Sequence, residues 1–269
     1  MRRFLEVDVF GSQPLLGNPV AVVLDADGLA ESQMQAIARW TNLSETTFVL
    51  PATDPFADYR VRIFTPAQEL PFAGHPTLGT CHAWLETNAH HGDEVVQECG
   101  AGLVRVRRGE RLAFAAPPLQ RSGAVAARDV AVVAQILGVE TSEVVDASWA
   151  DNGPGWIAVR LADAEAVRAV SPGDLRGHFI GVVGLGADGL EVRAFFPANG
   201  LGAEDPVTGS LNAAIAPWLV ESGVVSYPYE ARQGGALGRD GRVHLSRDAD
   251  GTVWVGGSTS TVVSGGLNL

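Results

Sequence analysis

The stretch Glu69-Leu-Pro-Phe-Ala-Gly-His-Pro-Thr-Leu-Gly-Thr80 and a second one, Glu204-Asp-Pro-Val-Thr-Gly-Ser-Leu-Asn-Ala213, decide the fold. In each, small and polar residues precede an apolar run that ends in Trp-Leu. This pattern is typical of a helix whose N-terminus faces a negative group, because free backbone N–H groups and the positive end of the helix dipole lie there. His75 and Ser210 are 135 positions apart in a chain of 269 residues. We therefore expect an internal duplication whose two helix N-termini share one anion-binding pocket.

Further segment pairs support the duplication. Three pairs resemble each other in the same order, at separations of 131 to 136 residues: Gly17–Leu24 with Gly153–Leu161, Arg60–Pro66 with Glu191–Pro197, and Gln97–Leu103 with Arg232–Leu237. Each half is expected to contain a strand pair, a helix (31–40 or 162–170), alternating strands, the glycine-marked helix and a final hairpin. The first glycine-marked helix is expected to begin at Pro76, where the missing N–H of proline costs nothing. Pro217 is expected to kink or interrupt the second.

The proline-containing segment 117–124 is the best candidate for a linker between the halves. We therefore expect an N-terminal lobe over residues 1–117 and a C-terminal lobe over residues 118–257. The strand-like tail 258–269 is expected to pack back onto the first lobe.

The composition excludes several classes of protein. The net charge of −12 argues against nucleic acid or an anionic membrane as a partner. The chain has no lysine, which excludes a pyridoxal phosphate Schiff base. Cys81, Cys99 and the six histidines lack the spacing of a metal site, so no metal and no cofactor are expected. Without an apolar membrane span or a signal-peptide core, a cytoplasmic protein is expected.

The segment Gly184-Leu-Gly-Ala-Asp-Gly189 fits the dinucleotide-binding fingerprint. That fingerprint requires a helix to open at its glycines. The following residues 190–196 instead alternate as a strand does, and Asp188-Gly189 is a common hairpin turn. The pattern therefore predicts a β-hairpin here and not a nucleotide site.

Three residues are candidates for chemistry. Glu45 lies between a helix and a β-branched strand, His75 lies at the first helix start, and Asp205 precedes the second. Each alone is more often a capping, turn or solvated residue. Because His75 and Asp205 adjoin both proposed anion-binding helix ends, the group together indicates a catalytic site.

The chain resembles the PhzF (phenazine biosynthesis F-like) family over nearly its whole length. The resemblance rests on five motifs in the family's order: Gly17-Asn-Pro-Val-Ala-Val-Val, Asn42-Leu-Ser-Glu-Thr, Phe64-Thr-Pro through His75-Pro-Thr-Leu-Gly, Glu204-Asp-Pro-Val-Thr-Gly-Ser and Val255-Gly-Gly. The sequence departs from the family pattern at Ala67-Gln68, where many members have an asparagine at the second position. The resemblance implies an α+β fold of the diaminopimelate epimerase type. In that fold two pseudo-symmetric lobes each form a curled, barrel-like mixed β-sheet around a central helix.

The resemblance also implies a function. Glu45 would be the general acid/base, with His75 and Asp205 as catalytic partners. Gly74, Gly209, Ser210 and Asn18 would bind the substrate, a small carboxylated metabolite of secondary metabolism. The family's best-known member isomerises trans-2,3-dihydro-3-hydroxyanthranilate without a cofactor, and a homodimer is plausible from the family.

Two alternatives stay open at this point. A protein that only binds a small anion would use the same helix ends but would gain nothing from Glu45. An epimerase would need Glu45 and a second base. The two-cysteine chemistry of related epimerases is not expected, since neither helix start carries a thiol and Cys81 lies nearly two turns into its helix.

Overall fold

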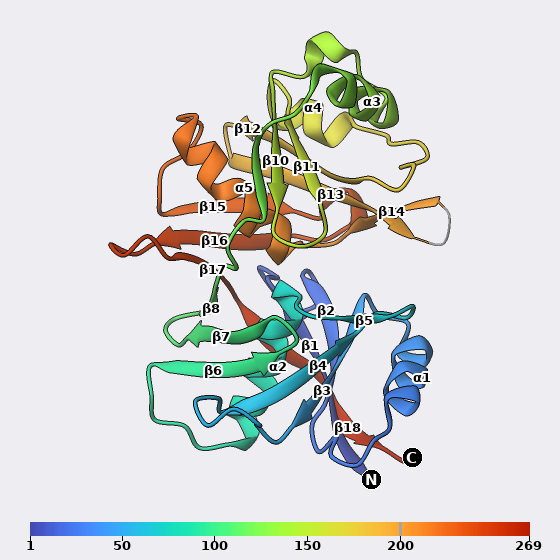
Figure 1. Ribbon diagram of the computed structural model, residues 1–269, viewed down its shortest axis with the longest axis vertical. Helices are drawn as coiled ribbons and strands as arrows, with labels where there is room; N and C mark the ends of the chain where they lie inside the picture. The colour runs from blue at the N-terminus through green and yellow to red at the C-terminus, as the bar shows by residue number, and fades with distance from the viewer. Residues whose placement is uncertain (199–200) are drawn as a thin grey trace. The chain divides into compact units, whose positions relative to one another are not determined.

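The computed structural model describes residues 1–198 and 201–269. The chain divides into two compact units. Unit 1 comprises Met1–Ala115 and Gly256–Leu269, and unit 2 comprises Ala116–Val255. Each unit is a mixed α+β structure with a curled β-sheet that does not close (Figure 1).

Unit 1 is built around one helix, α2 (Gly74–Thr87), as Figure 1 shows. Its strands are β1 (Arg2–Val9), β2 (Asn18–Val23), β3 (Glu45–Leu50), β4 (Tyr59–Phe64), β5 (Glu69–Leu70), β6 (Glu94–Cys99), β7 (Gly102–Arg107), β8 (Leu112–Ala115) and β18 (Thr259–Leu267). β1 pairs antiparallel with β2 and β18, β2 pairs parallel with β3, and β4 pairs antiparallel with β3 and parallel with β6. The C-terminal strand thus belongs to the sheet that contains the N-terminus.

Unit 2 is built around α5 (Gly209–Glu221). Its strands are β9 (Arg121–Ala124), β10 (Asp146–Asp151), β11 (Trp156–Arg160), β12 (Phe179–Gly186), β13 (Gly189–Ala198), β14 (Leu201–Asp205), β15 (Tyr229–Gln233), β16 (Gly241–Arg247) and β17 (Val253–Gly257), the last of which crosses the boundary between the units. β10 pairs antiparallel with β11 and β9, β11 pairs parallel with β12, and β13 pairs antiparallel with β12 and parallel with β15. This is the order and direction of pairing in unit 1, so the predicted duplication is confirmed.

The central helices are buried on nearly all sides. Leu78 and Cys81 of α2, and Leu211 and Ile215 of α5, have no exposed surface. Gly79 allows α2 to approach the sheet closely, because a Cβ there would lie 2.3 Å from the Val20 Cγ1 atom. Each helix N-terminus is consequently held at a defined place against its sheet.

The remaining helices cover separate cores. In unit 1, α1 (Glu31–Thr41) packs Met34, Ile37 and Ala38 against a cluster that includes Phe48 and Phe64. In unit 2, the residues of α3 (Ala127–Leu137) and α4 (Ala164–Ala169) pack in a cluster with strands β11 and β12. Burial of these apolar faces contributes about 25 cal/mol per Å² of area removed from water.

Several details differ from the prediction. α2 begins at Gly74, two residues before Pro76. Pro76 still lies in the first turn, where backbone N–H groups have no partner within the helix, so its missing N–H costs no helical hydrogen bond. α5 continues through Pro217 to Glu221, because burial of residues 211–216 and Leu219 offsets the lost backbone hydrogen bond. α3 was not predicted, although the helical spacing of Val130, Val133 and Leu137 before Gly138 indicates it.

The predicted hairpin is confirmed. β12 and β13 pair antiparallel up to Gly186 and Gly189, which leaves a two-residue turn at Ala187-Asp188. Gly189, predicted as part of the turn, is instead the first residue of β13, with a φ of +112° that glycine adopts readily. The fingerprint-like glycines are therefore turn and strand residues.

Candidate active site

Glu45 and His75 form a contact within unit 1. Glu45 is the first residue of β3, where it pairs with Val20 of β2, and His75 is the second residue of α2. The Oε2 atom of Glu45 lies 3.4 Å from Nε2 of His75, with exposed side-chain fractions of 15% and 5%. The start of β3 and the start of α2 thus bring a carboxylate and an imidazole together in a nearly buried place.

Asn18 contacts the other side of the same imidazole. It is the first residue of β2 and fully buried, and its Nδ2 atom lies 3.3 Å from Nδ1 of His75. Burial lowers the pKa of His75 to about 3, against a smaller opposing effect of the Pro19 carbonyl. His75 is therefore neutral near pH 7, and any charge on the pair resides on Glu45.

Gly74 begins α2 and is buried. The residue before it, Ala73, has no side-chain hydrogen bond to the first helical turn. Backbone N–H groups at such a terminus bind anions, since the helix dipole adds to them.

In unit 2 the predicted residues gather at the start of α5. Gly209 and Ser210 are its first two residues. Asp205, the last residue of β14, accepts a hydrogen bond of 2.6 Å from the Thr208 hydroxyl through Oδ2. The Asn152 side chain, in the loop between β10 and β11, donates to the Ser210 carbonyl at 2.9 Å.

Two buried glutamines, one beside each central helix, were not predicted. Gln97 in β6 donates to the Thr77 hydroxyl at 3.0 Å and accepts from the Tyr59 hydroxyl at 3.0 Å. Gln233 in β15 contacts the segment before α5. Both lie in segments that the duplication pairs, but the strand register matches Gln97 with Ala231, so the repeat does not reveal them.

The cysteine at α2 does not take part. Cys81 is fully buried, and burial raises the pKa of its thiol to about 12. A thiol with so high a pKa is a poor base at neutral pH. Among residues 1–198 and 201–269, no cluster of His, Cys, Asp or Glu has the arrangement of a metal site.

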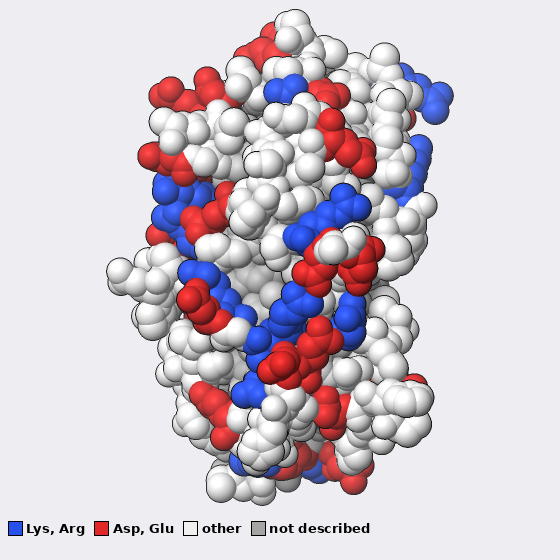
Figure 2. All heavy atoms as spheres, turned by 90° about the vertical axis from the view of Figure 1, so that its left-hand side faces the viewer, with Lys and Arg blue, Asp and Glu red and all other residues white. Residues whose placement is uncertain are grey.

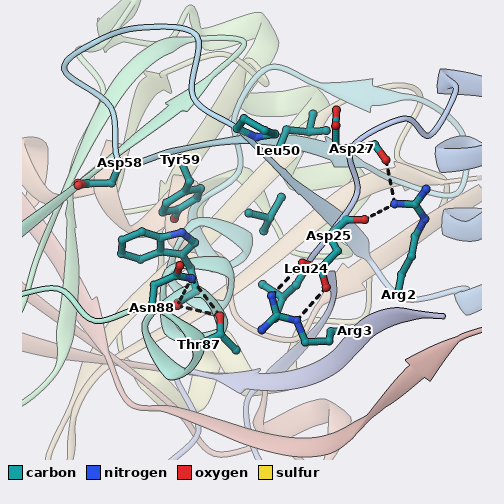
Figure 3. Close-up of a pocket in the computed structure, with 13 residues that line it drawn as sticks. Arg2, Arg3, Leu24, Asp25, Asp27, Leu50, Asp58, Tyr59, Thr87 and Asn88 are labelled. Atoms are coloured by element: carbon teal, nitrogen blue, oxygen red, sulfur yellow. Dashed lines mark hydrogen bonds and ion pairs between the residues drawn. The ribbon is translucent and has the colours of Figure 1, made fainter.

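A separate cavity of about 490 Å³ lies elsewhere in unit 1 (Figure 3). Its wall includes Arg2, Arg3, Asp25 and Trp84 but none of the seven predicted site residues. Its two arginines already have partners: Arg3 forms two 2.8 Å hydrogen bonds with Asp25, and Arg2 donates to the carbonyls of Asp25 and Asp27. The cavity therefore does not contain the candidate active site.

Charged side chains of both signs share the face drawn in Figure 2. Figure 2 shows arginine and acidic side chains intermixed over one face. Many arginines are paired with carboxylates, as Arg105 and Arg107 are with Glu94 and Arg242 is with Glu230. Nucleic-acid binding needs a continuous basic surface.

Comparison with known proteins identifies the family. A sequence model described as "Phenazine biosynthesis-like protein" (PhzC-PhzF) matches residues 7–265. The chain belongs to the PhzC-PhzF family. The trans-2,3-dihydro-3-hydroxyanthranilate isomerase of Pseudomonas fluorescens is 36% identical over 250 residues, covering 89% of this chain and 88% of that protein. The Schizosaccharomyces pombe protein named "Antisense-enhancing sequence 1" is 37% identical over 292 residues, covering 97% of each.

Solved structures agree with this assignment. A PhzC-PhzF-like fold is found in "Predicted Epimerase PA4716" from Pseudomonas aeruginosa, at a TM-score of 0.84 and 29% identity, covering 99% of each chain. A probable proline racemase from Agrobacterium radiobacter K84 shares the fold at a TM-score of 0.64 and 14% identity, covering 100% of this chain and 93% of that one. The fold is therefore that of the diaminopimelate epimerase-like proteins.

The PhzC-PhzF relatives named for an activity are isomerases, and this chain is an isomerase. Its substrate is accordingly a small molecule. No helix among the described residues is long and apolar enough to span a membrane.

Proposed function

We propose that this isomerase moves a proton from one carbon of a small carboxylated metabolite to another, without a cofactor, with Glu45 as general acid/base. The observation that carries the proposal is the contact between the Glu45 carboxylate and the buried His75 imidazole at 3.4 Å. A carboxylate largely withdrawn from water can remove a proton from carbon and return it, because its conjugate acid stays at the site.

The burial of His75 supports Glu45, and not His75, as the base. An imidazole with a pKa of about 3 binds a proton too weakly to remove one from carbon. A neutral imidazole can still donate a hydrogen bond, as long as the facing nitrogen carries the ring proton. In the proposed reaction the neutral His75 ring orients Glu45 and stabilises its carboxylate by donating a hydrogen bond, and Asn18 holds the ring.

The two helix N-termini supply groups suited to the substrate's charge. Gly74 at α2, and Gly209 and Ser210 at α5, are proposed to bind its oxygen atoms. Charge that develops beside the reacting carbon is stabilised by such preorganised N–H groups. Asp205 is proposed as a further catalytic carboxylate, which contacts the substrate and relays or stabilises a proton.

The substrate proposed for the first test is trans-2,3-dihydro-3-hydroxyanthranilate. Three relatives named for this isomerisation are 34 to 36% identical to the chain. The compound carries the carboxylate that the helix ends would bind.

The test follows turnover of this compound and deuterium uptake from D₂O by NMR. We expect Glu45→Gln to lower kcat by about 10²–10⁴-fold, since general acid–base catalysis contributes that much. The matched control is Glu86→Gln, which makes the same chemical change on α2 at a side chain 43% exposed and paired with His82. The control should keep the parent rate.

Equal rates for Glu45→Gln and the parent would overturn the assignment of Glu45. A product of inverted configuration, with its skeleton otherwise unchanged, would indicate epimerisation at one carbon and contradict proton transfer between two carbons.

A further inference from the structure

Gln233 is the last residue of β15, and only 1% of its surface is exposed. Its Oε1 atom accepts hydrogen bonds from the backbone N–H of Thr208 at 3.0 Å and from Nδ2 of Asn212 at 3.1 Å. Its Nε2 atom donates to the Thr208 hydroxyl at 2.9 Å and to the Asp205 carbonyl at 3.0 Å. One side chain thus contacts the whole segment that leads from Asp205 into α5.

These contacts determine the direction of each hydrogen bond. A backbone N–H can only donate, so the Gln233 atom facing Thr208 N must be the oxygen. The other end of the amide is then the NH₂ group, and the Thr208 hydroxyl oxygen accepts from it. The hydroxyl has one proton, which is left to point at Oδ2 of Asp205, 2.6 Å away. Asp205 therefore receives a hydrogen bond at Oδ2 and does not donate one there.

We propose that Gln233 is a positioning residue that acts through Thr208 to hold Asp205 as a hydrogen-bond acceptor in the orientation that the reaction uses. This inference rests on the proposed function of Asp205 and adds two residues to it.

A buried glutamine of unit 1, Gln97, makes a comparable series of hydrogen bonds that involves no carboxylate. There the order of donation runs from Tyr59 to Gln97, from Gln97 to the Thr77 hydroxyl, and from Thr77 to the Ala73 carbonyl at 2.9 Å. That path ends on the backbone at the start of α2, whereas the path in unit 2 ends on a carboxylate. A glutamine that only stabilised a helix start would not need the carboxylate.

The experiment measures kcat and KM with trans-2,3-dihydro-3-hydroxyanthranilate for single and double variants. Thr208→Val removes the hydroxyl but keeps the side-chain shape and the backbone bond to Gln233. We expect it to lower kcat by about 10-fold with KM within about 3-fold, since hydrogen bonds to charged groups contribute at this level. Thr208→Ser, which keeps a hydroxyl, should recover most of the parent kcat. Gln233→Leu, if it folds, should lower kcat by about as much as Thr208→Val does.

The double variant separates positioning from general stabilisation. Asp205→Asn alone should lower kcat by about 10²-fold. Adding Thr208→Val to Asp205→Asn should then change kcat by less than about 2-fold, because residues that act through one group are not additive.

The possible failures are distinguishable. If Asp205→Asn keeps the parent rate, or if the parent does not turn the compound over, the proposed function fails and the positioning role of Gln233 falls with it. If Asp205→Asn is impaired but Thr208→Val acts fully additively, or is not rescued by Thr208→Ser, only the positioning role is overturned.

Discussion

The N-terminus of α2 in unit 1 and the N-terminus of α5 in unit 2 occupy equivalent places in the duplicated topology but carry different side chains. His75, the second residue of α2, corresponds to Ser210 in α5. Glu45, the first residue of β3, corresponds to Phe179, the first residue of β12. The duplication therefore kept the strand pairing, whereas the carboxylate–imidazole pair lies in unit 1.

This difference shows which features belong to the fold and which belong to the reaction. Gln97 and Gln233 are both buried and both bond to a threonine near a helix start. The groups proposed to move a proton are not repeated. Both glutamines support a helix start, and Gln233 is in addition proposed to position Asp205 through Thr208. An asymmetric substrate explains why the proton-moving groups differ between the units.

The largest effect on kcat is expected from a comparison of His75 in α2 with Ser210 in α5, which occupy equivalent helix positions. We expect His75→Gln to lower kcat by about 10²-fold, because Glu45 loses its immediate partner. Ser210→Ala should mainly raise KM by about 5-fold, as expected for one hydrogen bond to the substrate. Steady-state kinetics of both variants check this, and equal effects on kcat would show that the two helix starts do the same work.

Replacing Gln97 or Gln233 should lower the local stability of a different central helix in each case. Gln97→Leu leaves the Tyr59 and Thr77 hydroxyls without this buried partner, which costs about 2–4 kcal/mol. Hydrogen exchange measured by mass spectrometry should show faster exchange in α2 and unchanged exchange in α5. Gln233→Leu should give the reverse pattern, and exchange that rises in both helices for either variant would contradict separate roles.

The buried imidazole should make unit 1 sensitive to acid. The pKa of His75 is about 3 in the folded protein and 6.5 as an ordinary value, so the unfolded chain binds a proton more tightly. Stability from this group is complete above about pH 6.5 and is lost as the pH falls toward 3. Between pH 7 and pH 5 the loss is about 2 kcal/mol.

Denaturant unfolding of the parent and of His75→Gln at both pH values measures this contribution. The variant should lose about 2 kcal/mol less than the parent. The same loss in both proteins would assign the acid sensitivity to other groups.

The smallest effect is expected at the cavity of Figure 3. A variant there compares the charged wall of this cavity with the Glu45–His75 contact in the same unit. Arg3 and Asp25 are 54% and 52% exposed, so their ion pair contributes about 0–1 kcal/mol. Asp25→Asn should leave kcat and KM unchanged and shift the thermal midpoint by only a few degrees. A loss of turnover comparable to that of Glu45→Gln would move the active site to this cavity.

Much of the architecture follows from local patterns. The two helix starts, the hairpin after Gly186 and the order of the repeated segments are all visible in short stretches of sequence, because glycine, proline and two-residue alternation act locally. α3 has no counterpart in unit 1, so the repeated segments do not indicate it. The exact start of α2 was misplaced because helix ends depend on capping contacts made by neighbouring segments.

The sequence by itself determined the duplication, the family and the candidates Glu45, His75 and Asp205. Only the tertiary structure decided that Asn18 and Glu45 lie on two sides of His75 and that Gln233 reaches Asp205 through Thr208. These partners are separated by up to 57 residues in sequence, and the pairing of β2 with β3 and the seating of α2 bring the unit 1 residues together. Side-chain contacts of this kind depend on strand register and helix position, which no local pattern encodes.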